Sequence, residues 1–336
     1  MTDESVRVRN PYYQGPVSGH FDGTRFFNPD GIEPGGFLDL MRWQFGGGKI
    51  AWPARYDSPF AKAVPDAAVA GTALRVTMVG HATLLIQVAG LNILTDPVWS
   101  KRASPVSFAG PQRVNDPGIA FGDLPKIDLV LVTHNHYDHM DLATLKALEA
   151  RFRPHIITPL GNDAIIHEAV PDAQISAMDW GDALNIIDGV SVNAEPCHHW
   201  SARGMGDRRK ALWAAFVITT PAGKIYHVGD TGFHNGINYR AVREKHGDIR
   251  LAILPFGAYE PRWFMKGQHQ NPEEAVDGLI ACGAAHAAGH HWGTFKLTNE
   301  GIEEPLRALE AAVDAKGLAR ERFRPMHPGE VFDVPW

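Results

Sequence analysis

The sequence predicts a mixed α/β fold, and two patterns support this expectation. From residue 74 onward, short runs rich in branched and aromatic residues recur between glycines and prolines, which indicates β-strands. Between some of these runs, apolar residues recur at helical spacing behind good helix caps, which indicates helices. The composition, 44% hydrophobic and 21% charged residues, is typical of a globular protein. We therefore expect strands and helices around a substantial core.

The first 70 residues predict an irregular arm that packs on this core. They are rich in Gly, Pro and aromatic residues, and only a short helix at 36–45 is expected among them. Their apolar side chains either pack on the core, which is the default, or line a groove for an acyl chain. The side chains in question are Phe21, Phe26, Phe27, Phe37, Leu38, Trp43, Phe45 and Trp52. We therefore divide the chain into an arm, 1–70, and a main domain, 71–336.

The next segments predict three strands, a fourth strand and a helix. The three runs 74–80, 83–89 and 91–96 are short, are broken by Gly, and indicate an antiparallel meander. The run that begins at Ile127 is apolar without interruption, as in a strand that is buried on both faces. Asp141 then caps a helix whose apolar residues recur at helical spacing. These residues are Leu142, Leu145, Leu148 and Phe152.

The second half of the chain predicts further strands and two helices. The expected strands are 155–159, 190–196, 212–220, 224–230 and 249–257. Pro-Ala-Gly at 221–223 forms the turn of a hairpin between the third and fourth of them. Asn271 is a strong N-cap, because Pro272 and two acidic residues follow it. A strand near 284–290 and a helix that ends at Gly317 are expected to close the chain.

Charge and cysteine content exclude several classes of protein. The net charge of −6 provides no general basic field for a nucleic-acid backbone, so no nucleic-acid partner is expected. Two cysteines are too few for a disulfide framework, which indicates a reducing compartment. The polar start is not a secretory signal, and no run is long enough for a membrane span. We expect a cytoplasmic protein with a small-molecule or phospholipid substrate, able to contact the inner membrane face peripherally. Nothing in the sequence specifies an oligomeric state.

Histidine clusters carry the chemistry. His134, His136, Asp138 and His139 form the pattern H-x-H-x-D-H directly behind a buried strand. Imidazole and carboxylate groups bind zinc, and also iron or manganese, and four of them in six positions indicate two metals in one site. The remaining ligands are expected at other strand ends. The candidates are one histidine of the pair His198 and His199, Asp230, and one of the pair His290 and His291.

Seven stretches together resemble the metallo-β-lactamase superfamily, and more closely the N-acylphosphatidylethanolamine-hydrolysing phospholipase D family. The resemblance is dense from Leu74 to Glu300. It rests on GHATLLIQV, TDPVWSKRASPVSFAGP, THNHYDHMD, HHWSAR, VGDTG, PFGAYEPRWFMK and HHWGTFKLTNE. It implies a four-layered αββα sandwich, in which two facing mixed sheets are flanked by helices, for the domain at 71–336.

The resemblance also implies a ligand set and a reaction. One zinc would be held by His134, His136 and His199, because the family's ligand histidines stand directly before Trp. The other zinc would be held by Asp138, His139 and His291, and Asp230 would bridge the two. A hydroxide between the metals would attack a phosphodiester, so Asp138 and Asp230 are the catalytic side chains, with His81 as a further candidate.

Two alternatives stay open at this point. The same metals and hydroxide would also suit the hydrolysis of a lactone, an amide or a thioester, because carbonyls are attacked in the same way. The second alternative is a non-catalytic, metal-dependent binding protein, which the complete ligand set disfavours.

Supporting and substrate-binding residues are expected around these ligands. Asp96 is placed to orient a ligand histidine, although a turn cap is an equal alternative, and Asp141 is first of all a helix cap. Arg262 and Lys266 are candidates for contact with a phosphate. Tyr259 and Glu260 belong to the same loop, and His327 is a weaker candidate near the C-terminus.

Overall fold

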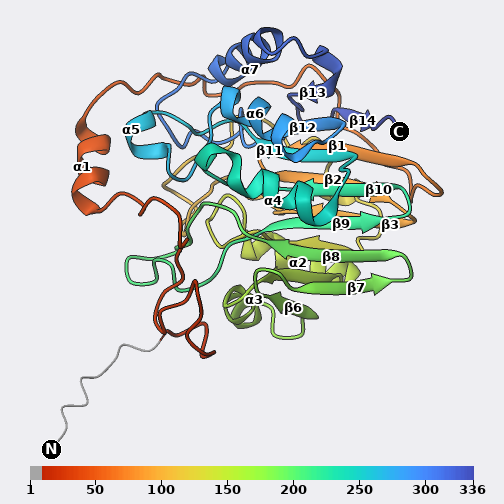
Figure 1. Ribbon diagram of the computed structural model, residues 1–336, viewed down its shortest axis with the longest axis horizontal. Coiled ribbons are helices and arrows are strands. Elements are labelled where there is room, and N and C mark those ends of the chain that lie inside the picture. The colour runs from red at the N-terminus through yellow and green to blue at the C-terminus, as the bar shows by residue number, and fades with distance from the viewer. Residues whose placement is uncertain (1–9) are drawn as a thin grey trace, which may run out of the picture.

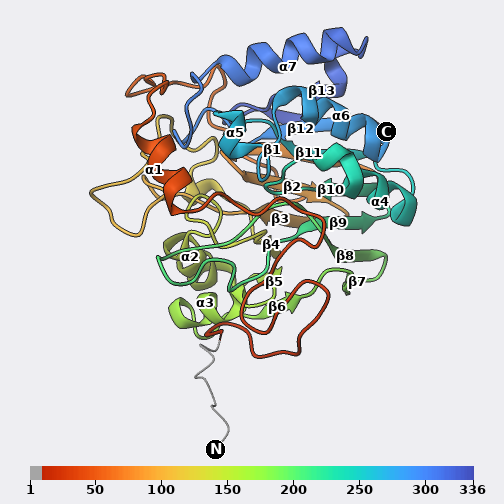
Figure 2. The ribbon, with the colours of Figure 1, turned by 60° about the vertical axis from the view of Figure 1, so that its left-hand side comes forward.

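The computed structural model describes residues 10–336, and in it two β-sheets pack face to face between layers of helices (Figure 1). Each sheet contains seven strands. The helices α2 and α3 cover one outer face, and α4, α6 and α7 cover the other (Figures 1 and 2). The predicted four-layered αββα sandwich is therefore confirmed.

The first sheet has the strand order β14-β1-β2-β3-β4-β5-β6. Strands β1, β2 and β3 form the predicted antiparallel meander, and β3, β4, β5 and β6 run parallel. The bounds are β1 Leu74–Gly80, β2 Thr83–Val88, β3 Leu91–Thr95, β4 Leu129–Leu131, β5 His155–Pro159, β6 Ile175–Met178 and β14 Val331–Asp333.

The second sheet has the strand order β13-β12-β11-β10-β9-β8-β7. The predicted hairpin is present, because β9 and β10 pair antiparallel across the turn at 221–222, and β10 to β13 run parallel. The bounds are β7 Ala183–Ile187, β8 Val190–Glu195, β9 Ala215–Thr220, β10 Gly223–His227, β11 Leu251–Pro255, β12 His286–His290 and β13 Phe323–Arg324.

The helices follow local sequence signals. Asp141 caps α2, since its carboxylate accepts a hydrogen bond from the backbone of Ala143, and Asn271 with Glu274 forms a capping box at α6. The bounds are α1 Phe37–Phe45, α2 Leu142–Phe152, α3 Asn162–Ala169, α4 Ile237–His246, α5 Arg262–Met265, α6 Pro272–Cys282 and α7 Glu304–Ala315. Single 3-10 turns lie at Phe121–Asp123, His234–Gly236 and Arg320–Arg322.

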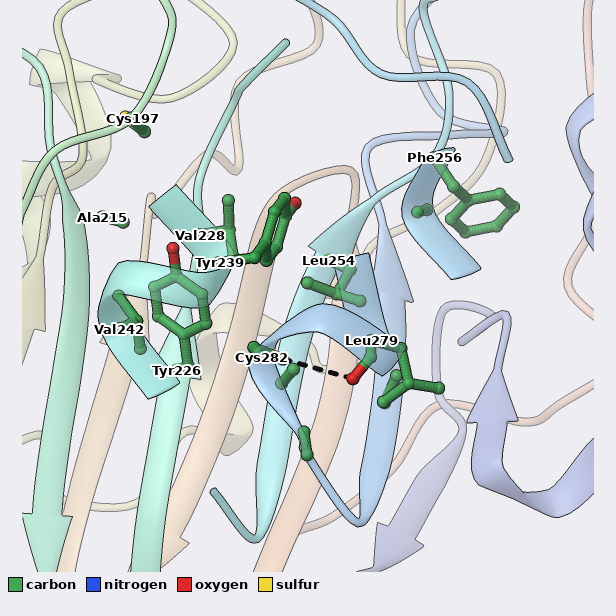
Figure 3. Close-up of a cluster of buried hydrophobic side chains, with 14 of the residues drawn as sticks. Cys197, Ala215, Tyr226, Val228, Tyr239, Val242, Leu254, Phe256, Leu279 and Cys282 are labelled. Atoms are coloured by element: carbon green, nitrogen blue, oxygen red, sulfur yellow. Dashed lines mark hydrogen bonds between the residues drawn. The ribbon is translucent and has the colours of Figure 1, made fainter. Parts of the chain in front are cut away.

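Side chains alternate between two layers of the core. On β2, Leu84 and Ile86 face the interior between the sheets, whereas Leu85 faces the layer beneath α2 and α3. A third cluster lies between the second sheet and α4, α6 and α7, where Tyr226 and Tyr239 pack around Cys282 (Figure 3). Both outer faces of the sandwich are therefore closed by helices. The clustered histidines and aspartates follow the carboxyl ends of strands.

Two expectations about strands are corrected by the structure. The strand expected from Ile127 is reduced to β4, because the amide of Thr133 donates to the carboxylate of Asp96 instead of continuing the ladder. The chain does not close with α7 either, since β13 and β14 follow, and β14 pairs with β1 at the sheet edge.

The arm contains one helix, α1, in its described part, and its aromatic residues divide into two groups. Phe21 and Phe26 are fully buried in the cluster beneath α4 and α6, whereas Phe37 and Phe45 on α1 are exposed. The boundary of the arm at residue 70 stays a prediction. Among residues 10–336, no helix combines the length and the apolar character that would be needed to cross a membrane.

Candidate metal centre

The clustered histidines and aspartates lie where strand ends of both sheets meet. Strands β1, β3 and β4 of the first sheet and β8, β10 and β12 of the second each end beside a residue of the cluster. Parallel strands place their carboxyl ends at the same edge of a sheet. The loops after these strands therefore bring together side chains that are as far apart in the sequence as His81 and His291.

Three histidines form the first group of the cluster. The Nε2 atom of His134 lies 2.9 Å from Nδ1 of His136, and Nε2 of His199 lies 3.2 Å from the same atom. All three can direct a ring nitrogen to one point. His134 and His136 come from the loop after β4, and His199 from the loop after β8.

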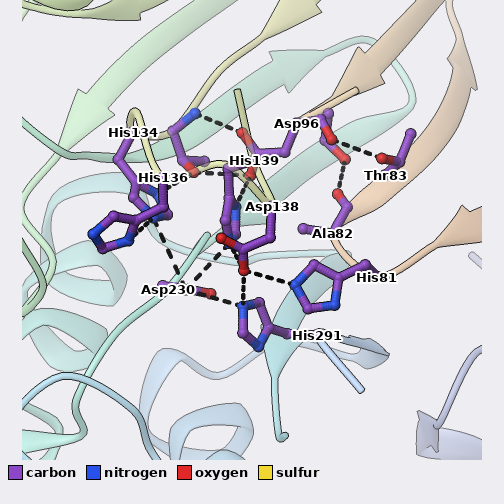
Figure 4. Close-up of polar contacts among 12 residues, drawn as sticks. His81, Ala82, Thr83, Asp96, His134, His136, Asp138, His139, Asp230 and His291 are labelled. Atoms are coloured by element: carbon purple, nitrogen blue, oxygen red, sulfur yellow. Dashed lines mark hydrogen bonds and ion pairs between the residues drawn. The ribbon is translucent and has the colours of Figure 1, made fainter. Parts of the chain in front are cut away.

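A second group lies beside the first and contains Asp138, His139, His291 and His81 (Figure 4). The Oδ2 atom of Asp138 lies 3.3 Å from Nε2 of His291, 3.5 Å from Nε2 of His139 and 2.9 Å from Nε2 of His81. His81, the further catalytic candidate from the sequence, thus lies within this group.

Asp230 lies between the two groups. Its Oδ2 atom is 3.0 Å from Nε2 of His291 and 3.2 Å from Nε2 of His139, and it is 3.7 Å from Nε2 of His199. The preceding Gly229 has φ = 65°, and a Cβ atom there would meet the side chain of Thr133 at 2.8 Å. Glycine therefore allows the loop after β10 to approach the loop after β4 closely enough to insert this carboxylate.

The backbone is strained at three positions of the site. His81, Asp96 and His291 have φ values of 56°, 37° and 67°, in the left-handed region that side chains other than glycine rarely adopt. Each such residue costs about 1–3 kcal/mol. The surrounding fold therefore holds these side chains in orientations that an unconstrained loop would avoid.

The electrostatics of the cluster fit a bound cation. Burial raises the pKa of Asp138 and Asp230, but the adjacent imidazoles outweigh it and hold both carboxyl pKa values well below their usual range. Burial lowers the pKa of His291, yet the carboxylates, above all Asp230, raise it to about 9. The same carboxylates hold the pKa of His139 well above its usual value, although its burial opposes them. Two buried carboxylates thus require positive charge beside them.

The donor atoms also fit a metal. Nε2 of His139 and His291 and Oδ1 of Asp230 are buried and have no hydrogen-bond partner among residues 10–336. Buried polar atoms without partners are costly, and a coordinated ion would satisfy them. The first group offers three donor atoms and the second offers four. This is more than the four ligands of one tetrahedral zinc.

Comparison with known proteins gives the same picture. The family model described as "Beta-lactamase superfamily domain" matches residues 91–292. The chain belongs to the metallo-β-lactamase superfamily. It is 35% identical over 274 residues to N-acyl-phosphatidylethanolamine-hydrolyzing phospholipase D 1 of Caenorhabditis elegans, which covers 78% of this chain and 76% of that protein.

Two further relatives support this membership. A UPF0173 metal-dependent hydrolase of Pyrobaculum neutrophilum is 30% identical, over 78% of this chain and the whole of that protein. The solved structure of a metallo hydrolase from Ignicoccus hospitalis superposes with a TM-score of 0.57 at 21% identity, over 79% of this chain and 99% of that one. The protein is thus a metal-dependent hydrolase of the metallo-β-lactamase fold.

In this hydrolase, Asp96 contacts His139 at the ring nitrogen that points away from the cluster. Its fully buried carboxylate lies 2.8 Å from Nδ1 of His139 and accepts hydrogen bonds from the amide and hydroxyl of Thr133, at 2.7 and 2.8 Å. The contact at Nδ1 directs Nε2 of His139 into the cluster. Nδ1 of His199 is held in the same way by the carbonyl of Gln268, at 3.1 Å.

The structure separates the members of the two histidine pairs. His199 and His291 lie in the cluster, whereas Nε2 of His198 lies 3.1 Å from Asp30 of the arm. His290 points to the other side of β12, where its ring lies 5.6 Å from that of His227. His199 and His291 lie outside the strands, in the loops after β8 and β12. The conformation of these loops, including the left-handed backbone of His291, therefore decides which member of each pair reaches the centre.

His269 is a residue of the hydrolase site that the sequence did not reveal. It precedes α6, and its Nδ1 atom lies 3.9 Å from Oδ2 of Asp230, in a group that also includes His199. Burial lowers its pKa to about 4, so the ring is neutral. A single histidine in the sequence QHQNP carries no ligand pattern, and only the tertiary structure brings it to the centre.

The predicted substrate-binding residues lie beside the cluster and are not members of it. The guanidinium of Arg262 donates to the carbonyl of His269 at 2.8 Å and to the carboxylate of Glu274 at 2.7 Å. The backbone amides of Tyr259 and Glu260 donate to the carboxylate of Glu300. Arg262 therefore braces the segment that carries His269.

The remaining candidates have separate environments. Lys266 is exposed at the end of α5, and His327 packs against Trp292 with ring centres 4.9 Å apart. Asp141 accepts hydrogen bonds from Ser100, Ala143 and Thr144, and thus caps α2 and ties it to the segment after β3. Of the two predicted supporting aspartates, only Asp96 contacts a histidine of the cluster.

An apolar cavity of about 230 Å³ opens beside the centre of this hydrolase, between α1 and α5. His136 and His269 line it and also belong to the metal-binding cluster, so the cavity adjoins the centre. Its other walls are largely hydrophobic, with Leu40 and Trp43 on α1, Phe264 on α5, and Trp200. A substrate that reaches the cluster through this cavity would be apolar over part of its length.

Proposed function

We propose that the protein is a dinuclear zinc phosphodiesterase of the phospholipase D type, which hydrolyses N-acylphosphatidylethanolamine-like glycerophospholipids and releases phosphatidate. The observation that carries the proposal is the apolar cavity that adjoins His136 and His269 of the metal centre. Its largely apolar lining suits part of an acyl chain whose phosphate lies at the histidines. The 35% identity to a phospholipase D of this specificity supports the same substrate class.

The seven proposed ligands divide between two ions. His134, His136 and His199 would hold one of them, and Asp138, His139 and His291 the other. Asp230 would contact both, since it lies between the two groups. When bound, two dications lower the pKa of water and stabilise charge on the attacking and leaving oxygens of a phosphodiester.

The protein's own residues orient this chemistry. Asp96 fixes the ring of His139 through Nδ1, and His81 holds Asp138 through a 2.9 Å contact. Neutral His269 faces the cavity, where its ring can donate a hydrogen bond to a phosphoryl oxygen. The apolar walls limit the access of water beside the reacting phosphate.

We also propose a cytoplasmic location, with peripheral contact at the inner membrane face where the lipid substrate would lie. The low cysteine content supports this location. Lys266 and Tyr259 remain proposed substrate contacts at the outer part of the site.

Elemental analysis combined with a substrate panel tests the function. The panel contains bis-p-nitrophenyl phosphate, N-acylphosphatidylethanolamine vesicles and several lactones. We expect about two zinc ions per chain, as in two-metal hydrolases, and release of phosphatidate from the vesicles. A metal-loaded protein that hydrolyses lactones but neither phosphodiester would reassign the activity to carbonyl substrates. One that is inert to the whole panel would leave only metal-dependent binding.

A further inference from the structure

The helix α1 exposes four of its six apolar side chains. None of its nine residues is buried, and Phe37, Leu38 and Phe45 are 71%, 81% and 82% exposed. Ile50, just beyond the helix, and Trp263, on the adjacent α5, are also exposed. A contiguous apolar surface of this kind on a folded protein indicates an interaction site.

Polar and aromatic contacts hold α1 in this position. The Nε1 atom of Trp43 donates to Oδ1 of Asn299 at 2.8 Å, and its ring stacks on Phe264 of α5 with ring centres 5.5 Å apart. The carboxylate of Asp39 accepts a hydrogen bond from the amide of Gly36 and caps the helix. The helix is therefore anchored through Trp43 and lies at the periphery of the molecule (Figures 1 and 2), with Leu38 and Phe45 exposed to solvent.

The exposed surface is continuous with the mouth of the apolar cavity. Phe37, Leu40 and Trp43 line the cavity from α1, and Phe264 lines it from α5. Leu38 and Phe45 belong to the same helix but do not line the cavity. The helix thus has one set of apolar residues toward the path to the metal centre and another set toward the outside.

Basic residues surround this surface, although the chain as a whole has a net charge of −6. The guanidinium of Arg42 lies 4.5 Å from the ring centre of Trp263, and Nζ of Lys49 lies 4.7 Å from that of Trp43. Lys266 is exposed at the end of α5. Asp39 is the single acidic residue of α1 and serves as its cap. Tryptophan and basic side chains around apolar residues are typical of a helix that lies in a membrane interface.

We propose that α1, together with Trp263, docks on the surface of an anionic phospholipid bilayer and so aligns the cavity mouth with the lipid. Leu38 and Phe45 enter the interface, and Arg42, Lys49 and Lys266 meet the anionic headgroups. This inference rests on the proposed function, because only a lipid substrate requires such alignment. It adds to that function the surface of the protein, α1 with Trp263, that contacts the membrane.

Vesicle co-sedimentation of the metal-loaded protein tests the docking surface. Vesicles of phosphatidylcholine alone are compared with vesicles that also contain phosphatidylglycerol. The double variant Leu38→Asp/Phe45→Asp removes the outer apolar side chains without altering the cavity lining. Ile187→Asp is the matched control, because Ile187 is 48% exposed on β7, on the opposite side of the molecule in Figure 1. Lys49→Glu tests the charge separately.

The double variant is expected to lose at least about tenfold in vesicle binding, because two inserted apolar side chains are replaced by charges. Its activity on vesicle-borne N-acylphosphatidylethanolamine falls in parallel, while its rate with bis-p-nitrophenyl phosphate stays at the wild-type value. Lys49→Glu weakens binding to the anionic vesicles only, and Ile187→Asp leaves every reading unchanged.

Two results would overturn the docking proposal. One is unchanged vesicle binding by the double variant. The other is a wild-type dimer in light scattering that the double variant dissociates, since a second copy of the chain would then be the occupant of this surface. A protein inert to both phosphodiesters whose vesicle binding still depends on Leu38 and Phe45 would refute the proposed activity and keep the docking surface, so the two failures are distinguishable.

Discussion

Replacement of Asp96 by asparagine isolates the contribution of a buried carboxylate that does not belong to the proposed ligand set. In the native protein, Oδ1 accepts from the amide of Thr133, and Oδ2 accepts from its hydroxyl and lies 2.8 Å from Nδ1 of His139. Asparagine preserves the volume and the oxygen at one position. In place of Oδ2 it carries a carboxamide NH2 group. This group is a hydrogen-bond donor and would face the Nδ1–H donor of His139.

The magnitude follows from these contacts. A hydrogen bond to a charged group contributes about 1.5–3 kcal/mol, and asparagine removes the one that orients His139. Loss of such a supporting carboxylate typically lowers metal affinity about 10–100-fold, which corresponds to about 1.4–2.8 kcal/mol in binding. We therefore expect Asp96→Asn to bind zinc one to two orders of magnitude more weakly.

Competition with a chromophoric chelator measures this affinity, and thermal melting of the metal-free protein measures folding. Thr133→Ser is the matched control, because serine keeps the hydroxyl that donates to Asp96, and its affinity is expected to match the wild type. The reasoning fails if Asp96→Asn binds zinc as tightly as the wild type. A lowered melting temperature with unchanged affinity would make Asp96 a structural residue only.

Three further predictions concern the centre itself. Asp230→Asn should lower metal content and activity together, by more than the about 10–100-fold expected for a supporting residue, and elemental analysis that finds both retained refutes its bridging position. In metal-free protein the pKa of His291 is raised from 6.5 to about 9, so its stabilisation is complete below 6.5 and is lost as the pH rises through about 9. Melting temperatures of the metal-free protein should therefore fall across that range while those of the metal-loaded protein do not, and equal profiles would count against the ionic cluster. His269→Gln should lower kcat about 100-fold or more, the usual loss when one positioned hydrogen-bond donor to developing negative charge is removed, at unchanged metal content, and a loss of metal would instead make His269 a ligand.

Local sequence patterns determined much of this protein. Asp141 and Asn271 predict helices, because an N-cap hydrogen bond joins residues within four positions of each other. The turn at 221–223 predicts a hairpin, because its two strands are adjacent in the chain. H-x-H-x-D-H at 134–139 indicates a metal site for the same reason, since four donors within one loop are neighbours in any fold. The superfamily likewise followed from short stretches that each carry their own pattern.

Tertiary structure alone decided the features that depend on distant contacts. Pairing of β14 with β1 joins segments more than 250 residues apart, and no local pattern specifies it. The sequence contains each histidine pair but not the loop conformation that turns His199 inward and His198 toward the arm. Arg262 reads as a phosphate contact, yet the fold directs its guanidinium to a carbonyl and to Glu274. His269 reaches the centre because α5 and α6 fix its loop beside β10. The physical reason is general. Packing between elements sets the orientation of a side chain toward a shared site, and residue spacing along the chain does not specify that packing.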